Sequence, residues 1–224
     1  MLTPSIFKAN DIRGVVTGDH PQWDRAGAHA IGAAFVRVLG LQGKQFVLAR
    51  DMRASGAELS AAFTEGALGQ GADVIDVGLA STDQLWYASG HFRVPGIQFT
   101  ASHNPAEYNG VKFCLADAAP IQPAMLTEIA RLAMGPALPA TERPGTRREQ
   151  DVLSEYAAHL HALVPLDGMR RLKVVYDAGN GMAGHTAPAV LQPLNLELIG
   201  LFTDLDGSFP NHPPNPLEPE NLLD

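Results

Sequence analysis

Cysteine, basic charge and long apolar runs are all scarce in this sequence, and each shortage excludes a class of protein. The one cysteine, Cys114, cannot form an intrachain disulfide, so we expect a cytoplasmic setting and a buried, inert thiol. The formal net charge is -8, which argues against nucleic-acid or anionic-membrane partners. No apolar run approaches the roughly 20 residues of a membrane helix, and no secretory signal pattern opens the chain. The sequence predicts a soluble protein.

The residues that are present alternate between strand-like and helix-like segments. Hydrophobic residues make up 46% and charged residues 18% of the 224, as in an ordinary globular protein. Alternating segments of this kind predict an α/β fold, which we expect to be a layered domain with a mixed sheet. The expected strands are 45–49, 73–77, 96–100, 110–115 and 172–176, and the expected helices are 23–39, 56–70, 120–134, 151–163 and 182–194.

A change in composition indicates a boundary between two domains. Segment 135–150 is rich in proline, glycine and charge and has no apolar period, so we predict a linker there between domains at 1–134 and 151–224. The second domain begins like the first but soon enters a proline-rich loop from Asp206 to Pro219. We expect this second domain to be of the same type as the first. Because few strands precede the last residue, we also expect it to be incomplete.

Polar clusters follow two of the expected strands. Arg50–Arg53 comes after the first strand and Thr100–Pro105 after the third, while Lys112 lies near the start of the next one. Near the N-terminus, Asp11 and Arg13 share one side of an extended segment because side chains alternate along it. Ligands of α/β sheets bind at the carboxyl ends of the strands, so these clusters are candidates for a binding or catalytic site.

Ser102 in the second cluster has three interpretations. It can belong to an ordinary turn, since Ser, Asn and Pro are common there. It can be a hydrolase nucleophile beside His103, although the Gly-x-Ser-x-Gly elbow is absent. It can also carry phosphate, whose charge of about -1.5 to -2 would need nearby cations such as Arg13, Arg53 and Lys112. The residues alone leave these alternatives open.

Several segments, taken together, resemble one known family. The chain is similar over nearly its whole length to the N-terminal half of the α-D-phosphohexomutase superfamily, of the phosphomannomutase/phosphoglucomutase type. Phosphoglucosamine mutases more often have Ser where Thr100 stands, so that branch is an alternative. The segments that carry the resemblance are Ile6–Gly14, Thr100–Pro105, Asn109–Lys112, Asp177–Gly184 and Asp206–Pro219.

The resemblance implies a reversible phosphoryl transfer between C1 and C6 of a mannose or glucose phosphate. A phosphoserine at Ser102 would donate to a hexose 1- or 6-phosphate and give a hexose 1,6-bisphosphate. The family holds Mg²⁺ through the phosphoserine and three aspartates of an Asp-Gly-Asp-Gly-Asp-Arg loop. That loop is absent from this sequence, so we expect these 224 residues alone not to turn over substrate.

Other site residues follow from the same resemblance. Arg13 and Lys112 would flank the reacting phosphate, with Lys112 a candidate general acid or base. His103 would orient the loop or the substrate, and Asn104 would contact substrate. Arg53 is either a support of the substrate site or a solvated ion-pair residue. The chain departs from the family at residue 10, where Asn stands in place of the common Tyr.

Two rival functions come from other features. The run Gly179–Gly184 reads G-x-G-x-x-G, and Asp204 lies about twenty residues on, as in dinucleotide-binding oxidoreductases. A proline-rich loop follows instead of a further βαβ unit, so a tight strand-to-helix turn with close packing is the preferred interpretation. A non-catalytic module that binds sugar phosphates is the second rival, and it predicts an unphosphorylated Ser102.

Overall fold

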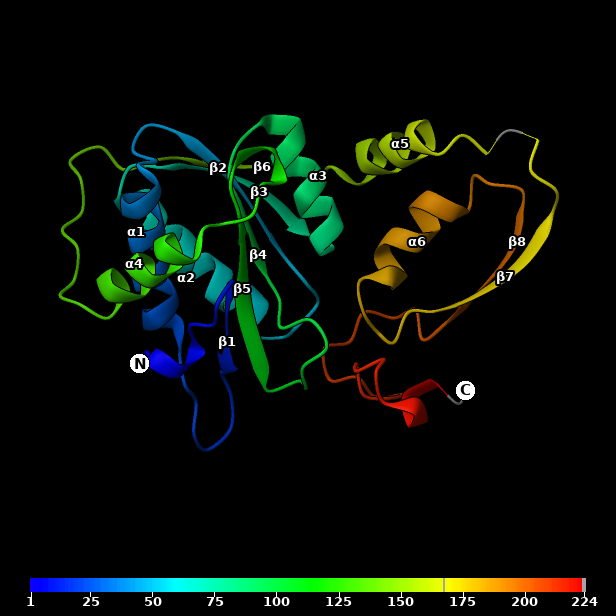
Figure 1. Cartoon of the computed structure of the whole chain (residues 1–224), viewed down its shortest axis with the longest axis horizontal. Coiled ribbons are helices and arrows are strands. Elements are labelled where there is room, and N and C mark those ends of the chain that lie inside the picture. The colour runs from blue at the N-terminus through cyan, green and yellow to red at the C-terminus, as the bar shows by residue number, and fades with distance from the viewer. Residues whose placement is uncertain (167, 223–224) are drawn as a thin grey trace.

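The chain folds into two α/β units that follow each other in sequence (Figure 1). We describe residues 1–166 and 168–222 of a computed structural model. The first unit contains η1 (Pro4–Ile6), β1 (Asp11–Val15), α1 (Arg25–Leu39), β2 (Gln45–Arg50), α2 (Gly56–Gly69), β3 (Asp73–Leu79), α3 (Thr82–Phe92), β4 (Gly96–Phe99), β5 (Tyr108–Cys114), η2 (Ala116–Ala118), α4 (Pro123–Ala133) and β6 (Arg147–Glu149). The second contains α5 (Leu153–Leu163), β7 (Leu172–Asp177), α6 (Ala183–Leu191), β8 (Leu196–Leu201) and η3 (Pro219–Leu222).

The first unit is built on a mixed sheet of six strands in the order β1-β5-β4-β2-β3-β6. β2 pairs in parallel with both β3 and β4, whereas β5 is antiparallel to β4 and β1. This confirms the predicted α/β class and the mixed sheet. The parallel strands end at the same edge, so the loops after β2 and β4 lie side by side there.

Both faces of this sheet are covered, which explains why β2 reads as an uninterrupted apolar run. Phe46 and Leu48 point to the core under α1, α2 and α4, and Val47 and Ala49 point to a smaller core under α3. Figure 1 shows α3 on the opposite side of the sheet from the other three helices. The sheet is therefore the middle layer of three.

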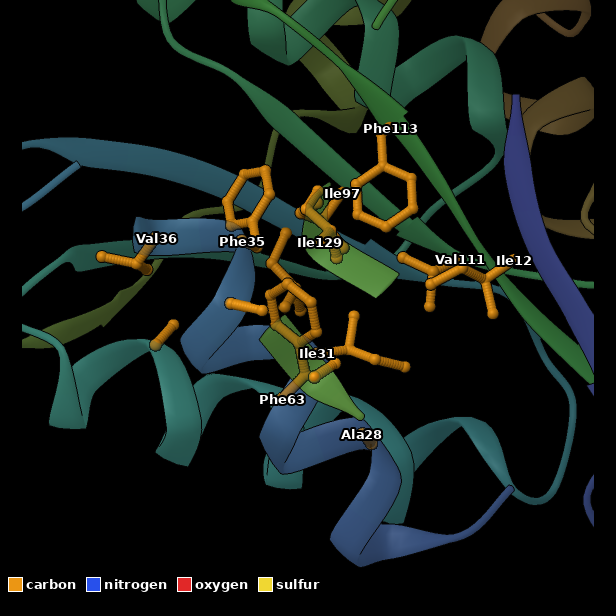
Figure 2. Packing of buried hydrophobic residues seen from close by; sticks show 14 of the residues in the cluster. Ile12, Ala28, Ile31, Phe35, Val36, Phe63, Ile97, Val111, Phe113 and Ile129 are labelled. Atoms are coloured by element: carbon orange, nitrogen blue, oxygen red, sulfur yellow. The ribbon is translucent and has the colours of Figure 1, made fainter. Parts of the chain in front are cut away.

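Aromatic and branched side chains fill the larger core (Figure 2). Phe35 of α1 meets Phe46 edge-to-face with ring centroids 5.2 Å apart, and Phe63 of α2 meets Phe99 at 5.6 Å. The two helices approach closely because Gly32 of α1 lies against the α2 backbone, where an added Cβ would fall 2.1 Å from a carbonyl oxygen. This packing fixes the sheet edge that carries the candidate site.

The structure of the first unit differs from the sequence-based prediction in one helix and one strand. α3 was not predicted, although Ser81 and Gln84 form a complete capping box at its start. β6 lies inside segment 135–150, where we expected only a linker, because its backbone pairs in parallel with β3. Arg147 of β6 also forms an ion pair with Asp76 of β3 at 2.7 Å. The sheet of the first unit thus extends into the predicted linker.

The second unit has a parallel pair of strands, β7 and β8, joined through α6. Burial alternates along β7, as expected when only one face of a sheet is covered. The other face carries Val175 and Ile199, which are 57% and 36% exposed. Within the described part of the chain, no helix has both the length and the apolar character needed to cross a membrane.

Candidate active site

Ser102 lies exposed at the tip of the loop between β4 and β5, at the carboxyl edge of the parallel strands. Its φ of +56° is in the left-handed region, which costs a non-glycine residue about 1–2 kcal/mol. Two polar contacts lie within this turn. The Ser102 N–H donates to Thr100 Oγ1 at 2.9 Å, and Ser102 Oγ lies 3.4 Å from His103 Nδ1. The hydroxyl is therefore presented to solvent by a backbone held in an uncommon conformation.

A buried guanidinium holds this loop from beneath. Arg53 is 2% exposed, and its Nη1 donates to the carbonyl oxygens of Pro105 and Tyr108 at 2.7 and 3.0 Å. Its Nη2 donates to the carbonyl oxygens of Ser102 and Asn104 at 2.9 and 2.6 Å. The alternative of a solvated ion-pair residue is therefore wrong for Arg53. The contacts support the site through the loop backbone, and direct contact of Arg53 with substrate stays a prediction.

Asp51 is the ionic partner of this arginine. Its carboxylate accepts from the Arg53 N–H at 3.0 Å, and its second oxygen lies 3.4 Å from Arg53 Nε. Burial raises the pKa of Asp51, and hydrogen bonds from Thr100 and Arg53 oppose that rise. Burial likewise lowers the pKa of Arg53, which the negative charge of Asp51 opposes. The pair is thus a desolvated ion pair that ties the loop after β2 to the loop after β4.

Arg13 and Asn104 are also brought to the serine loop. Arg13 Nη1 donates to Asn104 Oδ1 at 2.9 Å, and its Nη2 donates to Asp11 Oδ2 at 2.7 Å. Lys112 lies opposite Asp11 on the neighbouring strand, but it lines a different cavity from the cleft that contains Ser102. The structure therefore groups Arg13, His103 and Asn104 around Ser102 and sets Lys112 further along the same sheet.

The cleft beside Ser102 has a volume of about 440 Å³ and is lined by both units. The second unit contributes Asp177 and His212, whose carboxylate oxygen and Nε2 lie 3.0 Å apart. Phe209 of the proline-rich loop stacks under Arg53, with its ring centroid 5.2 Å from the guanidinium carbon. We did not predict these three residues as site residues, although all of them lie in motif segments that the sequence singles out.

The glycine-rich turn after β7 serves packing. Gly179 has a φ of +50°, and α6 begins shortly after it. A Cβ on Gly184 would lie 2.0 Å from the carbonyl oxygen of Thr203, so only glycine allows the helix to approach the segment after β8. This close approach agrees with the tight-turn interpretation.

No cluster of three or more His, Cys, Asp or Glu side chains suited to a metal ion occurs in residues 1–166 and 168–222. A phosphate on the exposed Ser102 hydroxyl would supply hard oxygen donors, which are the ligands Mg²⁺ prefers.

Comparison with known families assigns the chain. The description "Phosphoglucomutase/phosphomannomutase, alpha/beta/alpha domain I" matches residues 4–135, and that of domain II of the same family matches residues 154–224. The loop that presents Ser102 falls within the first match, whereas β6 lies between the two matches. The chain belongs to the phosphoglucomutase/phosphomannomutase family, as its motif segments predicted.

Individual relatives agree with this assignment. The chain is 38% identical to a phosphomannomutase/phosphoglucomutase of Pseudomonas putida, over all of this chain and 47% of the relative. It is 38% identical to a phosphomannomutase of Escherichia coli, over 98% of this chain and 49% of the relative. A solved family protein from Burkholderia thailandensis superposes with a TM-score of 0.87 at 37% identity, over all of this chain and 49% of that one. The chain spans about half the length of the curated relatives it matches.

Proposed function

We propose that this chain supplies the phosphoserine half of a phosphohexomutase that moves a phosphoryl group between C1 and C6 of mannose or glucose phosphates. Ser102 carries the phosphoryl group, donates it to a hexose 1- or 6-phosphate, and regains one from the bound hexose 1,6-bisphosphate. The observation that carries the proposal is the exposed Ser102 hydroxyl, held at positive φ by the buried Arg53 in a chain of this family. The names of the relatives, which include phosphomannomutases and phosphoglucomutases, support this substrate class.

The charges around the loop support this role. Phosphoryl transfer depends mainly on positioning and on neutralising charge, so cations near the serine are the main requirement. Arg13 lies beside the loop through Asn104, and His103 Nδ1 lies near the serine oxygen. We assign Arg13 to balancing the charge of the phosphate and His103 to orienting it. Lys112, which lies further along the sheet, would act as a general acid or base on a hydroxyl of the sugar.

Magnesium is the cofactor that the family implies. When bound, Mg²⁺ would supply charge neutralisation at the phosphate on Ser102. The remaining ligands would come from aspartates outside this chain, so we expect the 224 residues alone to be inactive. The cytoplasm is the location we propose, because the one cysteine, Cys114, is buried and has no second cysteine in these 224 residues with which to form a disulfide. A coupled mutase assay with robust activity for this chain would refute the expected inactivity.

The phosphoserine is tested by intact mass after incubation with Mg²⁺ and glucose 1,6-bisphosphate. The protein used is this chain joined to the remaining half of a full-length relative, so that metal ligands outside the 224 residues are present. We expect a gain of about 80 Da, the mass of one phosphoryl group, that is absent from Ser102→Ala. Ser81→Ala is the matched control, because Ser81 lines the same cleft and should leave the mass gain unchanged. A gain that persists in Ser102→Ala, or no gain in the wild type, would overturn the proposal and favour the non-catalytic module.

A further inference from the structure

His212 of the proline-rich loop is a largely buried titratable side chain to which the proposed function gives no role. The side chain is 16% exposed, and its ring meets the ring of Phe202 edge-to-face with centroids 5.6 Å apart. Gly179 makes room for the imidazole, since an added Cβ there would lie 3.1 Å from His212 Cε1. The ring is therefore fitted against the segments that follow β7 and β8.

Both ring nitrogens of His212 face oxygen atoms that accept hydrogen bonds. Nδ1 lies 2.9 Å from the carbonyl oxygen of Pro213, and Nε2 lies 3.0 Å from Oδ2 of Asp177. The other carboxylate oxygen of Asp177 accepts from the N–H of Gly179 at 2.7 Å. A carbonyl oxygen and an ionised carboxylate cannot donate, so each nitrogen needs a proton to make its bond. The charged imidazolium makes both bonds, and the neutral ring loses one of them.

The charges around His212 also favour the imidazolium. His212 lines the cleft that contains Ser102, and the carboxylates of Asp51, Asp83 and Asp177 line it too. Among the described residues, no lysine or arginine belongs to that lining. Arg53, which the same loop contacts, is paired with Asp51. Negative charge near an imidazole stabilises its protonated form.

The proline-rich loop connects this histidine with the support of the serine loop. The Asp206 N–H donates to the carbonyl oxygen of Asn180, in the glycine-rich turn after β7, at 3.0 Å. Between Asp206 and His212, the ring of Phe209 covers the guanidinium of Arg53. This stretch of the loop is therefore fastened to the second unit at both of its ends and contacts the first unit in between.

We propose that His212 is a positioning residue, whose imidazolium clamps the proline-rich loop to the carboxylate of Asp177 at the end of β7. The clamp keeps Phe209 on Arg53, which in turn binds the carbonyl oxygens of the loop that presents Ser102. The benefit to phosphoryl transfer rests on the proposed function. The clamp itself does not, and it is measured without any phosphate.

The clamp has a definite dependence on pH. Histidine loses its proton near neutral pH, and the docked loop uses that proton in a bond to an anion. Docking and proton binding therefore favour each other, so the loop is held at low pH and released as the pH rises. A neutral side chain in place of His212 should abolish this dependence.

The first experiment reads the protonation state of His212 in the 224-residue chain by long-range ¹H–¹⁵N NMR of its histidines. The His212 signals are those absent from His212→Gln. At about pH 6.5 we expect both ring nitrogens to carry protons. In Asp177→Asn the anionic partner is gone, so His212 should lose its proton at a lower pH than in the wild type.

The second experiment reads docking by amide hydrogen exchange at Asp206, expressed as a protection factor so that the intrinsic effect of pH cancels. We expect protection in the wild type to fall about tenfold or more between about pH 6 and pH 9, as for the loss of one charge-assisted hydrogen bond. His212→Gln should show low protection at both pH values. His185→Gln, in α6 of the same unit, is the matched control and should behave like the wild type. Exchange at Ser102 should follow exchange at Asp206.

Three results would each overturn the proposal. They are a neutral His212 at about pH 6.5, protection at Asp206 that His212→Gln leaves unchanged, and exchange at Ser102 that stays constant while the loop is released. The first of these needs no stable variant apart from the one used for assignment. A chain that shows the clamp but never gains phosphate on Ser102 would sink the mutase proposal alone.

Discussion

Replacing Arg53 tests whether a buried side chain holds the loop that presents Ser102. The guanidinium donates to four carbonyl oxygens of that loop, at distances from 2.6 to 3.0 Å. Arg53→Ala removes all of these bonds and leaves the Asp51 carboxylate buried without its partner. Arg53→Lys keeps the charge but loses the planar arrangement of donors that matches the four acceptors.

The expected loss follows from the burial of this group. A hydrogen bond from a charged donor contributes about 1.5–3 kcal/mol, but a loosened loop recovers part of that loss by contact with water. Removing one partner of a buried ion pair costs about 3–5 kcal/mol, and we expect Arg53→Ala to fall in that range. For Arg53→Lys we expect about 2–3 kcal/mol. Against a total stability of about 5–15 kcal/mol, either loss is large.

Urea unfolding followed by tryptophan fluorescence measures the loss, because Trp23 and Trp86 both lie in the first unit. Amide hydrogen exchange at Ser102 measures the order of the loop itself. The matched control is Arg147→Ala, which removes a guanidinium with 46% side-chain exposure and an ion pair to Asp76. Because this guanidinium is about half exposed to water, we expect its removal to cost only about 1 kcal/mol.

The reasoning fails if Arg53→Ala unfolds at the same urea concentration as Arg147→Ala. It also fails if stability falls while exchange at Ser102 is unchanged. In that case Arg53 would stabilise the unit without ordering the loop.

Three further predictions follow from close contacts and burial. Gly32→Ala should destabilise the first unit by about 1–3 kcal/mol in thermal unfolding, because its Cβ would lie 2.1 Å from a carbonyl oxygen of α2. Gly69→Ala points into open space and should be neutral or stabilising by up to about 1 kcal/mol, so equal effects would contradict the packing argument. Burial raises the pKa of Cys114, so a thiol reagent at pH 8 should react at least about tenfold slower with the folded chain than in denaturant. Gly207→Ala would place a Cβ 2.7 Å from the backbone of the loop after β2, so limited proteolysis of the proline-rich loop should become faster, and an unchanged rate would refute a tight contact there.

Local sequence patterns were sufficient for most elements of the fold. The strand at β2 and the helices at α1 and α2 follow from apolar runs and periodicity, because both faces of the sheet are buried. α3 was missed because polar residues and Gly90 weaken its apolar period, even though the capping box at Ser81 marks its start. β6 has no apolar signal at all, since its three residues are exposed and only pairing with β3 makes them a strand.

The candidate site was predictable where one segment carries the chemistry. Ser102, His103 and Asn104 lie within one motif, so their proximity follows from the sequence itself. The hydrogen bonds from Arg53 to the serine loop could not be predicted from the sequence. The four partners lie about fifty residues away, and they are backbone carbonyl oxygens, which any residue type supplies.

The contacts of Arg53 also bear on how the two units depend on each other. Its guanidinium lies over the ring of Phe209 in the second unit while it donates to the serine loop in the first. A positive φ at Ser102 is unfavourable in isolation, so the loop keeps this conformation only while its carbonyls are bound. Because Phe209 covers the same buried guanidinium, undocking the proline-rich loop would hydrate Arg53 and weaken its grip on those carbonyls. We therefore expect the presentation of the Ser102 hydroxyl to depend on contact between the two units.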